Sequence, residues 1–394
     1  MQSNRWLLPE GVQEMVPPET WRIEAARRQL LDLYWRWGYD LIRPPLIEYL
    51  DSLLTGAGHE LDLQTFKLTD QLSGRMMGVR SDITTQATRI DAHRLQAIGP
   101  ARYCYIGSIL RTRPEEPGGS RSPLQVGAEK FGDAHIDSDL EIVSLMLETL
   151  TLMGIDNACL DLGHVAIYRR LVAHAEMSAE LEPVLFDVIQ RKSGPDLDAM
   201  AAAGRIDVCS HVRFQTLIGL NGEPGVLERA REALAGIDDE IDSALERLGA
   251  MADLLATHYP QMPLFVDLAE LRGYRYKTGL LYAAFAAGLG RELARGGRYD
   301  DMGAEFGRAR PATGFSADLN LLAALGRFDP ATHRGAIHAP PGSDPQLLAS
   351  VRRLRAAGER VIVATPTAND PVGSHCDRVL EFIDGRWDVR PIAS

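Results

Sequence analysis

Apolar residues repeat at intervals of three to four between residues 23 and 37, and this spacing predicts an amphipathic helix that ends at Gly38. A second helix is predicted from residue 138 to about residue 153. Ser138 and Glu141 have the spacing of a capping box, in which two side chains satisfy backbone N–H groups at the start of a helix. Along the chain, a predicted helix therefore precedes the first strands and another follows them.

Three extended segments lie between these helices. Residues 39–47 include two adjacent prolines, which exclude them from the centre of a sheet, so we expect them at an edge or an interface. Residues 103–110 and 124–131 have the composition of strands. Glycine and proline at 117–120 lie between them and predict a long hairpin.

The second half of the chain changes character twice. Residues 176–260 are rich in Ala, Leu, Glu and Arg at helical spacing, which predicts a helical insertion. Strand patterns return at 264–268 and 280–287. Residues 330–394 follow the order strand, helix, strand and hairpin, so we expect a separate small α/β domain after a core formed by residues 1–329.

Composition limits the classes of function. The 394 residues are enough for two or three domains, and 42 basic against 54 acidic residues give a net charge of −12, so we expect no nucleic-acid partner. The longest nearly apolar run, residues 280–290, is too short to cross a membrane, which needs about 20 residues. Widely spaced cysteines and an N-terminus without an apolar signal segment predict a cytoplasmic protein.

Common catalytic and cofactor motifs are absent from the sequence. It contains no phosphate-binding GxxxxGK[ST] loop, no glycine triplet of a dinucleotide site and no GxSxG nucleophile motif. The histidines and cysteines do not have zinc-ligand spacing. We therefore expect no catalytic residues, no metal and no cofactor.

The predicted hairpin carries polar residues at alternate positions. Residues two apart in a strand share a face, so Arg111 lies on the face of the first strand that carries its tyrosines, and Gln125, Gly127 and Glu129 share a face of the second. If the two faces coincide, a guanidinium, an amide and a carboxylate surround an open glycine floor, which suits a small zwitterion. The alternative is a solvated face with an ordinary ion pair.

Three other segments are polar where apolar residues are common. Asp82 and Thr84 lie on one side of an extended stretch, or else cap a helix over residues 86–95. Residues 272–279 form a tyrosine-rich segment with three cations, or else a surface turn. By themselves, residues 296–300 predict only a tight turn.

In this order, the segments resemble the class II aminoacyl-tRNA synthetases and, among them, the histidyl branch. The resemblance covers about residues 8–325 and implies an α+β fold, an antiparallel sheet flanked by helices. The matching segments are 38–47, similar to the motif of the class II dimer interface; 80–84, similar to the amino-acid-binding loop; 111–132, similar to motif 2; and 272–279 and 297–300, similar to two histidyl-specific blocks.

The departures from this pattern concern ATP. The last class II motif should run from Gly-Phe into a helix whose arginine binds the phosphate tail, but here it begins at Gly314 and places Leu321 at the arginine position. Asp318 replaces a glycine, and a carboxylate repels phosphate. In the tyrosine-rich block, Arg275 replaces an aspartate and Lys277 a tyrosine. We therefore expect that adenylation has been lost.

The amino-acid pocket of the family is retained, and the resemblance implies that it binds histidine. The implied contacts are Asp82 and Thr84, helped by Gln125, to the ammonium; Arg111 and Arg272 to the carboxylate; Glu129 to the imidazole N–H; and Tyr276 to the ring.

A synthetase-like chain with a histidine pocket and no phosphate clamp resembles the regulatory subunits of short-form ATP phosphoribosyltransferase. This resemblance implies a homodimer formed through the class II interface and a hetero-octamer with the catalytic subunit. It also implies activation of that subunit and feedback inhibition by L-histidine in the first step of histidine biosynthesis. The alternatives are an active histidyl-tRNA synthetase, an ATP-dependent amide-forming ligase, and a scaffold subunit that does not sense histidine.

Overall fold

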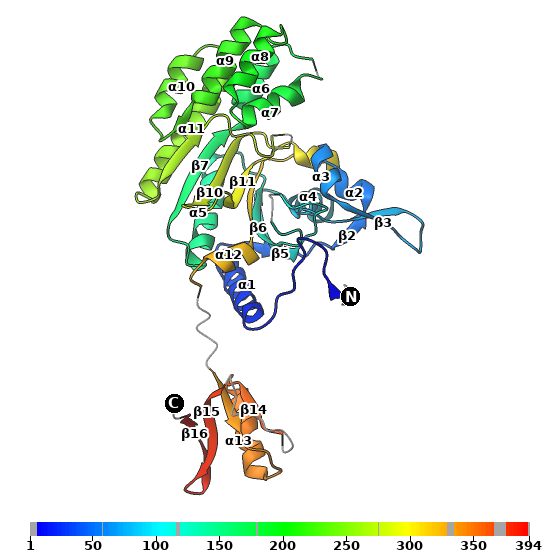
Figure 1. The fold of residues 1–394 in the computed structure, drawn as a ribbon, viewed down its shortest axis with the longest axis vertical. Helices are drawn as coiled ribbons and strands as arrows, with labels where there is room; N and C mark the ends of the chain where they lie inside the picture. Colours follow the sequence, from blue (N-terminus) through cyan, green and yellow to red (C-terminus); the bar gives the residue numbers. More distant parts are fainter. Residues whose placement is uncertain are drawn as a thin grey trace, which may run out of the picture. The chain divides into compact units, whose positions relative to one another are not determined.

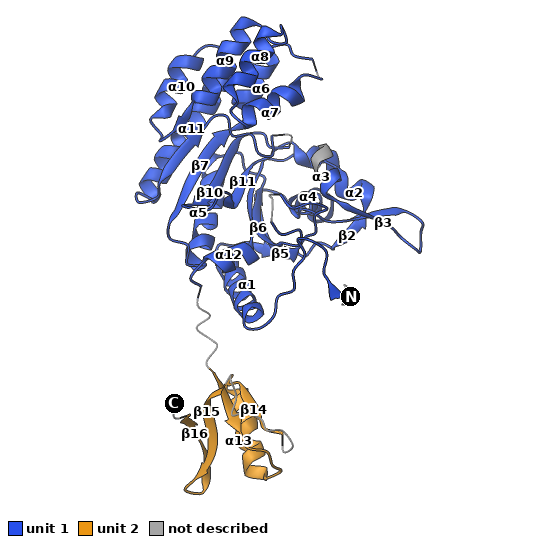
Figure 2. Cartoon of the chain, in the orientation of Figure 1, with its two compact units in different colours: residues 1–328 blue, residues 329–394 orange. Residues whose placement is uncertain are grey.

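The protein consists of two compact units, residues 1–328 and residues 329–394 (Figure 2). The structure is a computed structural model and describes residues 6–392 except 57, 116–118, 179, 275, 329–334 and 366–375. The tip of the predicted hairpin and Arg275 thus lie outside the described residues. Each unit has its own sheet and its own apolar core.

A nine-stranded, mainly antiparallel sheet forms the centre of the first unit (Figure 1). Only the β1–β5 and β7–β9 pairs are parallel. The α+β class predicted from the sequence is confirmed. In spatial order the strands are β1 (Asp40–Leu41), β5 (Ala101–Ser108), β6 (Leu124–Phe131), β12 (Ala312–Asp318), β11 (Glu292–Arg298), β10 (Leu280–Ala286), β7 (Ala158–His164), β9 (Leu264–Asp267) and β8 (Asn221–Gly222).

Helices α1 (Glu19–Arg36), α5 (Ile136–Leu152) and α12 (Leu319–Leu325) pack together and against the strands of this sheet. The apolar stripe of α1 is buried, as its spacing predicts, with Leu30 and Tyr34 fully inaccessible. The other elements of this half are a small sheet of β2 (Ile47–Tyr49), β4 (Met76–Val79) and β3 (Phe66–Thr69), the helices α2 (Leu50–Leu54), α3 (Gly58–Gln64) and α4 (Thr84–Arg89), the π-helix η2 (Ile90–Leu95) and the 3₁₀ helix η3 (Met302–Phe306).

The predicted capping box is wrong. Helix α5 begins two residues before Ser138, and the ring of His135 accepts the backbone N–H of Asp137 at 3.4 Å. Ser138 donates to Asp133 at 2.7 Å. The Glu141 carboxylate instead binds an arginine and a lysine from the strands beneath, because charge-assisted hydrogen bonds are stronger than a single bond from a backbone N–H.

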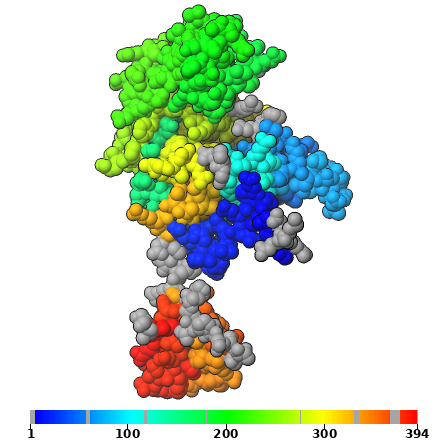
Figure 3. All heavy atoms as spheres, viewed as in Figure 1, coloured from blue at the N-terminus to red at the C-terminus, as the bar shows by residue number. Residues whose placement is uncertain are grey.

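A group of helices forms one end of the first unit, drawn in green in Figures 1 and 3. Its core joins that of the sheet through residues such as Tyr168, Phe214 and Leu245. Among the described residues, no helix has the length and apolarity needed to span a bilayer. The helices are α6 (Val165–His174), α7 (Glu182–Gln190), α8 (Gly194–Ala202), α9 (Val208–Gly219), α10 (Val226–Leu234) and α11 (Asp239–His258).

The second unit is a four-stranded sheet with one helix. Its core contains Ile337, Leu347 and Leu380. Asp384 and Gly385 both have positive φ, 50° and 82°, as the predicted two-residue hairpin turn requires. The sheet order is β14 (Val361–Val363), β13 (Ala336–Ala339), β15 (Cys376–Ile383) and β16 (Arg386–Pro391), and the helix is α13 (Pro345–Ala356).

One expectation about the centre of the large sheet is confirmed and one is wrong. A helix does follow Gly314, but strand β12 first continues to Asp318, and α12 begins at Leu319. The expected turn at residues 296–300 is instead the end of strand β11 and the residues that follow it. A Cβ on Gly296 would collide with the ring of Tyr282, so this glycine is required for close packing within the sheet.

A buried ion pair links α5 to β11 and should contribute strongly to stability. Asp139 is fully buried and lies 3.0 Å from Arg298, whose side chain is 4% exposed. We expect Asp139→Asn to lower the free energy of unfolding by about 3 kcal/mol, because it removes the one fully buried carboxylate that pairs with both Arg298 and Arg247 and leaves Arg298 with only the partly exposed Asp300. Urea denaturation measures this change.

The matched control is Asp187→Asn, which removes an exposed carboxylate paired with Arg191. This variant should change stability by less than about 1 kcal/mol. Equal effects of the two substitutions would contradict the structural importance of the buried pair.

Candidate functional site

The two strands of the hairpin place their polar residues on one common face. Tyr105 pairs with Gly127 and Gly107 pairs with Gln125, so the faces predicted for β5 and β6 coincide. Gln125 is 3% exposed and Glu129 is 1% exposed. The alternative of a solvated hairpin face is therefore wrong.

Glu129 is part of the wall of a small cavity of about 40 Å³ on this face. The lining combines carboxylates, hydroxyls and cations with glycines that leave the backbone accessible. Its members are Asp82, Thr84, Glu129, Tyr276, Lys277, Arg295, Gly296, Gly297, Tyr299, Gly314, Phe315 and Ser316.

The Glu129 carboxyl group is held by two tyrosines. The hydroxyl of Tyr105 donates to one oxygen at 2.9 Å and the hydroxyl of Tyr299 donates to the other. Burial, and to a smaller extent the nearby Asp82, raises the pKa of Glu129 to about 8, although the two tyrosine hydrogen bonds oppose the shift. A ligand N–H or cation placed against this group would favour its ionised form.

Asp82 and Gln125 form a second polar contact beside Glu129. The amide of Gln125 donates to Asp82 at 2.9 Å and accepts the backbone N–H of Ile83 at 2.9 Å. Asp82 also accepts the backbone N–H of Thr84 at 2.6 Å, at the first residue of α4. Asp82 therefore both binds the start of this helix and lines the cavity.

The predicted arginines lie elsewhere. Arg272 forms an ion pair with Glu292 at 2.6 Å and lines neither this cavity nor a larger neighbouring one. Arg111 lines the larger cavity and pairs with Glu115 at 2.9 Å. Of the predicted residues, the small cavity contains Asp82, Thr84, Glu129 and Tyr276, while Gln125 and Arg111 line the larger cavity.

The larger cavity, of about 90 Å³, contains the altered positions of the last class II motif. Leu321 and Asp318 both line it. Burial raises the pKa of the Asp318 carboxyl, against the opposing effect of Arg111 and Arg291. The charged groups of the lining are three guanidinium groups and three carboxylates: Arg111, Arg291, Arg295, Glu115, Glu292 and Asp318.

Most of these charges pair with one another. Arg295 binds both Glu115 and Glu292, so that alternating charges connect Arg111 to Arg272. A phosphate tail could reach Arg111 or Arg295 only by displacing a carboxylate from it. Arg291 was not identified from the sequence; it lines this cavity together with Asp318 and opposes the rise in the pKa of that carboxyl.

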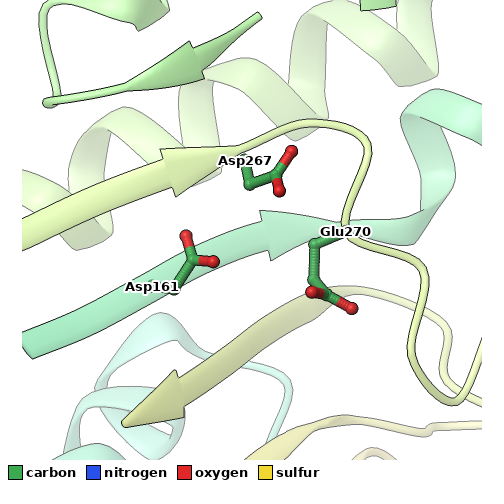
Figure 4. Close-up of side chains that lie close together, drawn as sticks. All are labelled: Asp161, Asp267 and Glu270. Atoms are coloured by element: carbon green, nitrogen blue, oxygen red, sulfur yellow. The ribbon is translucent and has the colours of Figure 1, made fainter. Parts of the chain in front are cut away.

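An acidic cluster contains two residues, Asp267 and Glu270, that shortly precede Arg272 in the chain (Figure 4). Oxygens of Asp161, Asp267 and Glu270 lie within 4.8 Å of one another. Lys192 binds Asp267 at 2.5 Å, and Glu270 accepts the backbone N–H of Arg272 at 2.7 Å. Burial, with the two neighbouring carboxylates, raises the pKa of Asp161 to about 7. The cluster therefore fixes the backbone from which the Arg272 segment starts.

Tyr299, Lys277 and Arg295 are among the residues of the small cavity that sequence reasoning missed. Tyr299 lies in the block at 297–300, which resembles a histidyl-specific motif, so its role could have been found from that motif. Lys277 was noted only as a departure from a tyrosine. No motif marks Arg295, which reaches the cavity because β11 lies at the centre of the sheet.

The fold and this cavity define a protein of the histidyl-tRNA synthetase class. A family profile described as "Histidyl-tRNA synthetase" matches residues 11–322, and one described as "ATP phosphoribosyltransferase subunit HisZ C-terminal domain" matches residues 334–390. A histidyl-tRNA synthetase structure from Nostoc sp. PCC 7120 aligns over 96% of this chain and 91% of its own, with a TM-score of 0.78 and 16% identity.

Closer relatives define the family within this class. An "ATP phosphoribosyltransferase regulatory subunit" of Ectopseudomonas mendocina is 52% identical over 99% of both chains, and one of Thioalkalivibrio sulfidiphilus is 54% identical over 96% of both. The structure named "ATP phosphoribosyltransferase regulatory subunit/histidyl-tRNA synthetase" from Bacillus halodurans has a TM-score of 0.83 at 24% identity, covering 95% of this chain and 97% of its own. The chain belongs to the family of ATP phosphoribosyltransferase regulatory subunits and is a regulatory rather than a catalytic subunit.

The raised pKa of Glu129 predicts a pH-dependent contribution to stability. Between the usual value of 4.5 and about 8, the unfolded chain loses the proton of this group while the folded chain keeps it. Stability therefore falls as the pH rises, by up to about 1.4 kcal/mol per pH unit from this group. Glu129→Gln removes the effect, so the variant should gain stability relative to the wild type between about pH 5 and about pH 8.

Urea denaturation across this pH range measures the difference between the two proteins. Glu228→Gln, on an exposed face of α10, is the control and should run parallel to the wild type. A constant difference between Glu129→Gln and the wild type would mean that Glu129 is already ionised in the folded protein.

Proposed function

We propose that the chain assembles with and activates the catalytic subunit of short-form ATP phosphoribosyltransferase and transmits feedback inhibition by L-histidine to it. The observation that carries the proposal is the contrast between the two cavities. The smaller one is lined by carboxyl and hydroxyl groups suited to an amino acid, whereas Leu321 and Asp318 line the larger one, at the positions where the synthetase motif has an arginine and a glycine.

In this proposal, L-histidine occupies the small cavity. Asp82 and Thr84 receive its ammonium, helped by Gln125, which donates to Asp82. Glu129 accepts an imidazole N–H, and Tyr276 lies near the ring. Burial of Glu129 and the hydrogen bond between Gln125 and Asp82 support this assignment, because both carboxyl groups are positioned before the ligand arrives. The resemblance assigns the carboxylate of histidine to Arg111 and Arg272.

Feedback requires that histidine bind two states of the assembly with different affinity. The ion pairs that connect Arg272, through Glu292 and Arg295, to the motif 2 segment offer a path for such a difference. Histidine bound beside Arg295, which lines the small cavity, would alter these pairs. The regulatory subunit would then hold the catalytic subunit differently when histidine occupies the cavity.

The proposed assembly is a homodimer within a hetero-octamer that acts in the cytoplasm. The segment that resembles the class II dimer motif exposes Leu41 and Leu46, which are 58% and 49% accessible, and α1 exposes Trp35 at 77%. Apolar side chains of this size at one edge of the sheet suit a surface covered by a second copy. Co-purification with the catalytic subunit, followed by size determination, tests this assembly.

Loss of one carboxylate should separate histidine sensing from activation. We expect Asp82→Asn to weaken L-histidine binding at least about tenfold, because the variant keeps a hydrogen-bonding group and loses the charge that attracts the ammonium. Calorimetry and inhibition of the reconstituted complex measure the effect. Activation of the catalytic subunit without histidine should persist.

Asp187→Asn, which alters an exposed carboxylate of the helical insertion, serves as the control for this experiment. If Asp82→Asn and Glu129→Gln leave both activation and histidine inhibition unchanged, the chain is a scaffold that does not sense histidine.

The synthetase alternative makes an opposite prediction about ATP. The purified chain should show no histidine-dependent exchange between ATP and pyrophosphate, because Leu321 cannot donate to a phosphate and Asp318 repels one. Restoring the arginine with Leu321→Arg alone should not create activity, since the carboxylates of the larger cavity remain. Exchange by the wild-type chain would contradict the proposed loss of catalysis.

A further inference from the structure

The small cavity contains two cations that the family resemblance does not assign to the ligand. These are Lys277 and Arg295. The resemblance gives the ligand carboxylate to Arg111 and Arg272, but neither of these lines the small cavity. The group that receives a carboxylate inside this cavity must therefore be sought among the cations that are there.

Arg295 is already occupied. Its guanidinium binds Glu292 at 2.7 Å and also binds Glu115. Arg272 shares Glu292 with it, at 2.6 Å. A ligand carboxylate that approached either arginine would compete with an internal carboxylate already in place, and each exchange would cost an existing charge-assisted hydrogen bond.

Lys277 is different because it is buried without a charge partner. Its side chain is 6% exposed, and its ammonium donates to the backbone carbonyl of Gly296 at 2.6 Å. No described carboxylate forms an ion pair with it. An ammonium has three N–H donors, so two remain for other acceptors.

The alkyl chain of Lys277 is held in place by backbone on two sides. A Cβ on Gly273 would lie 3.0 Å from its Cε, and one on Gly297 would lie 3.0 Å from its Cδ. Both glycines have positive φ, at 74° and 159°. The lysine thus reaches the cavity through a channel that only these small residues leave open, and its ammonium is positioned before any ligand binds.

The surroundings of Lys277 favour an anion. Burial and, to a smaller extent, Arg295 lower the pKa of Lys277 to about 7, against the opposing effect of Glu270 and Glu292. A buried ammonium bonded to one neutral oxygen has lost hydration that its partner does not replace. A carboxylate in the cavity would restore that interaction.

We propose that Lys277 binds the carboxylate of the amino-acid ligand, opposite the Glu129 and Asp82 side of the cavity. This inference rests on the proposed function and assigns a specificity residue to the same site. Glu129 accepts from the ring and Asp82 attracts the ammonium, while Lys277 distinguishes an amino acid from the amine that lacks its carboxylate. The replacement of a tyrosine by Lys277 is then a change in how the ligand is recognised.

Calorimetry with L-histidine and with histamine tests the proposal on the full chain assembled with its catalytic subunit. The wild type should bind L-histidine at least about tenfold more tightly than histamine. Lys277→Met should weaken L-histidine about 30-fold, as expected for one charge-assisted hydrogen bond in a buried site, and change histamine less than about threefold. Unchanged histamine binding also shows that the cavity of the variant is intact.

Lys67→Met, which removes an exposed lysine paired with Asp62, is the control and should bind both ligands as the wild type does. Equal affinity of the wild type for L-histidine and histamine would overturn the proposal even if Lys277→Met failed to fold. L-histidine binding that Lys277→Met leaves unchanged would overturn it while sparing the proposed function. Absence of L-histidine binding by the wild type would instead remove the proposed function itself, and this inference with it.

Discussion

A carboxyl group buried at the centre of an antiparallel sheet constrains the surrounding structure. Glu129 can remain there only because two tyrosine hydroxyls donate to it and because Gly314, on the neighbouring strand, leaves room for its oxygens. Burying this group without a cation costs free energy that the rest of the core must offset. A ligand N–H that donates to Glu129 would offset part of this cost, and the imidazole of the proposed histidine supplies such an N–H.

In the neighbouring larger cavity, by contrast, most charged groups are already paired. Its guanidinium groups are mostly neutralised by carboxylates of the same chain, and an aliphatic side chain, Leu321, occupies the position where the synthetase motif has an arginine. The two cavities lie on the same sheet and share Arg295 and Ser316. Under the proposed function, the same sheet keeps amino-acid recognition and has lost phosphate binding, and membership of the regulatory-subunit family agrees with that separation.

The alternation of side chains in strands was enough to predict the polar face of β5 and β6, because a period of two determines which residues meet once the strands pair. Strand β11 was missed because Gly296 and Gly297 resemble a turn in sequence, although they are needed for close packing in the sheet. The partners of Arg272 could not be predicted, since Glu292 reaches it through the tertiary fold. Likewise, nothing local to Lys277 indicates that its ammonium enters the cavity.

A crystal structure of the assembled complex with both L-histidine and a non-hydrolysable ATP analogue would show which ligand each cavity holds. We expect histidine in the small cavity, with an imidazole nitrogen against Glu129, and no nucleotide in the larger cavity of this chain. A nucleotide whose phosphates bind Arg291 in the larger cavity, beside histidine poised for adenylation, would contradict the proposed loss of phosphate binding.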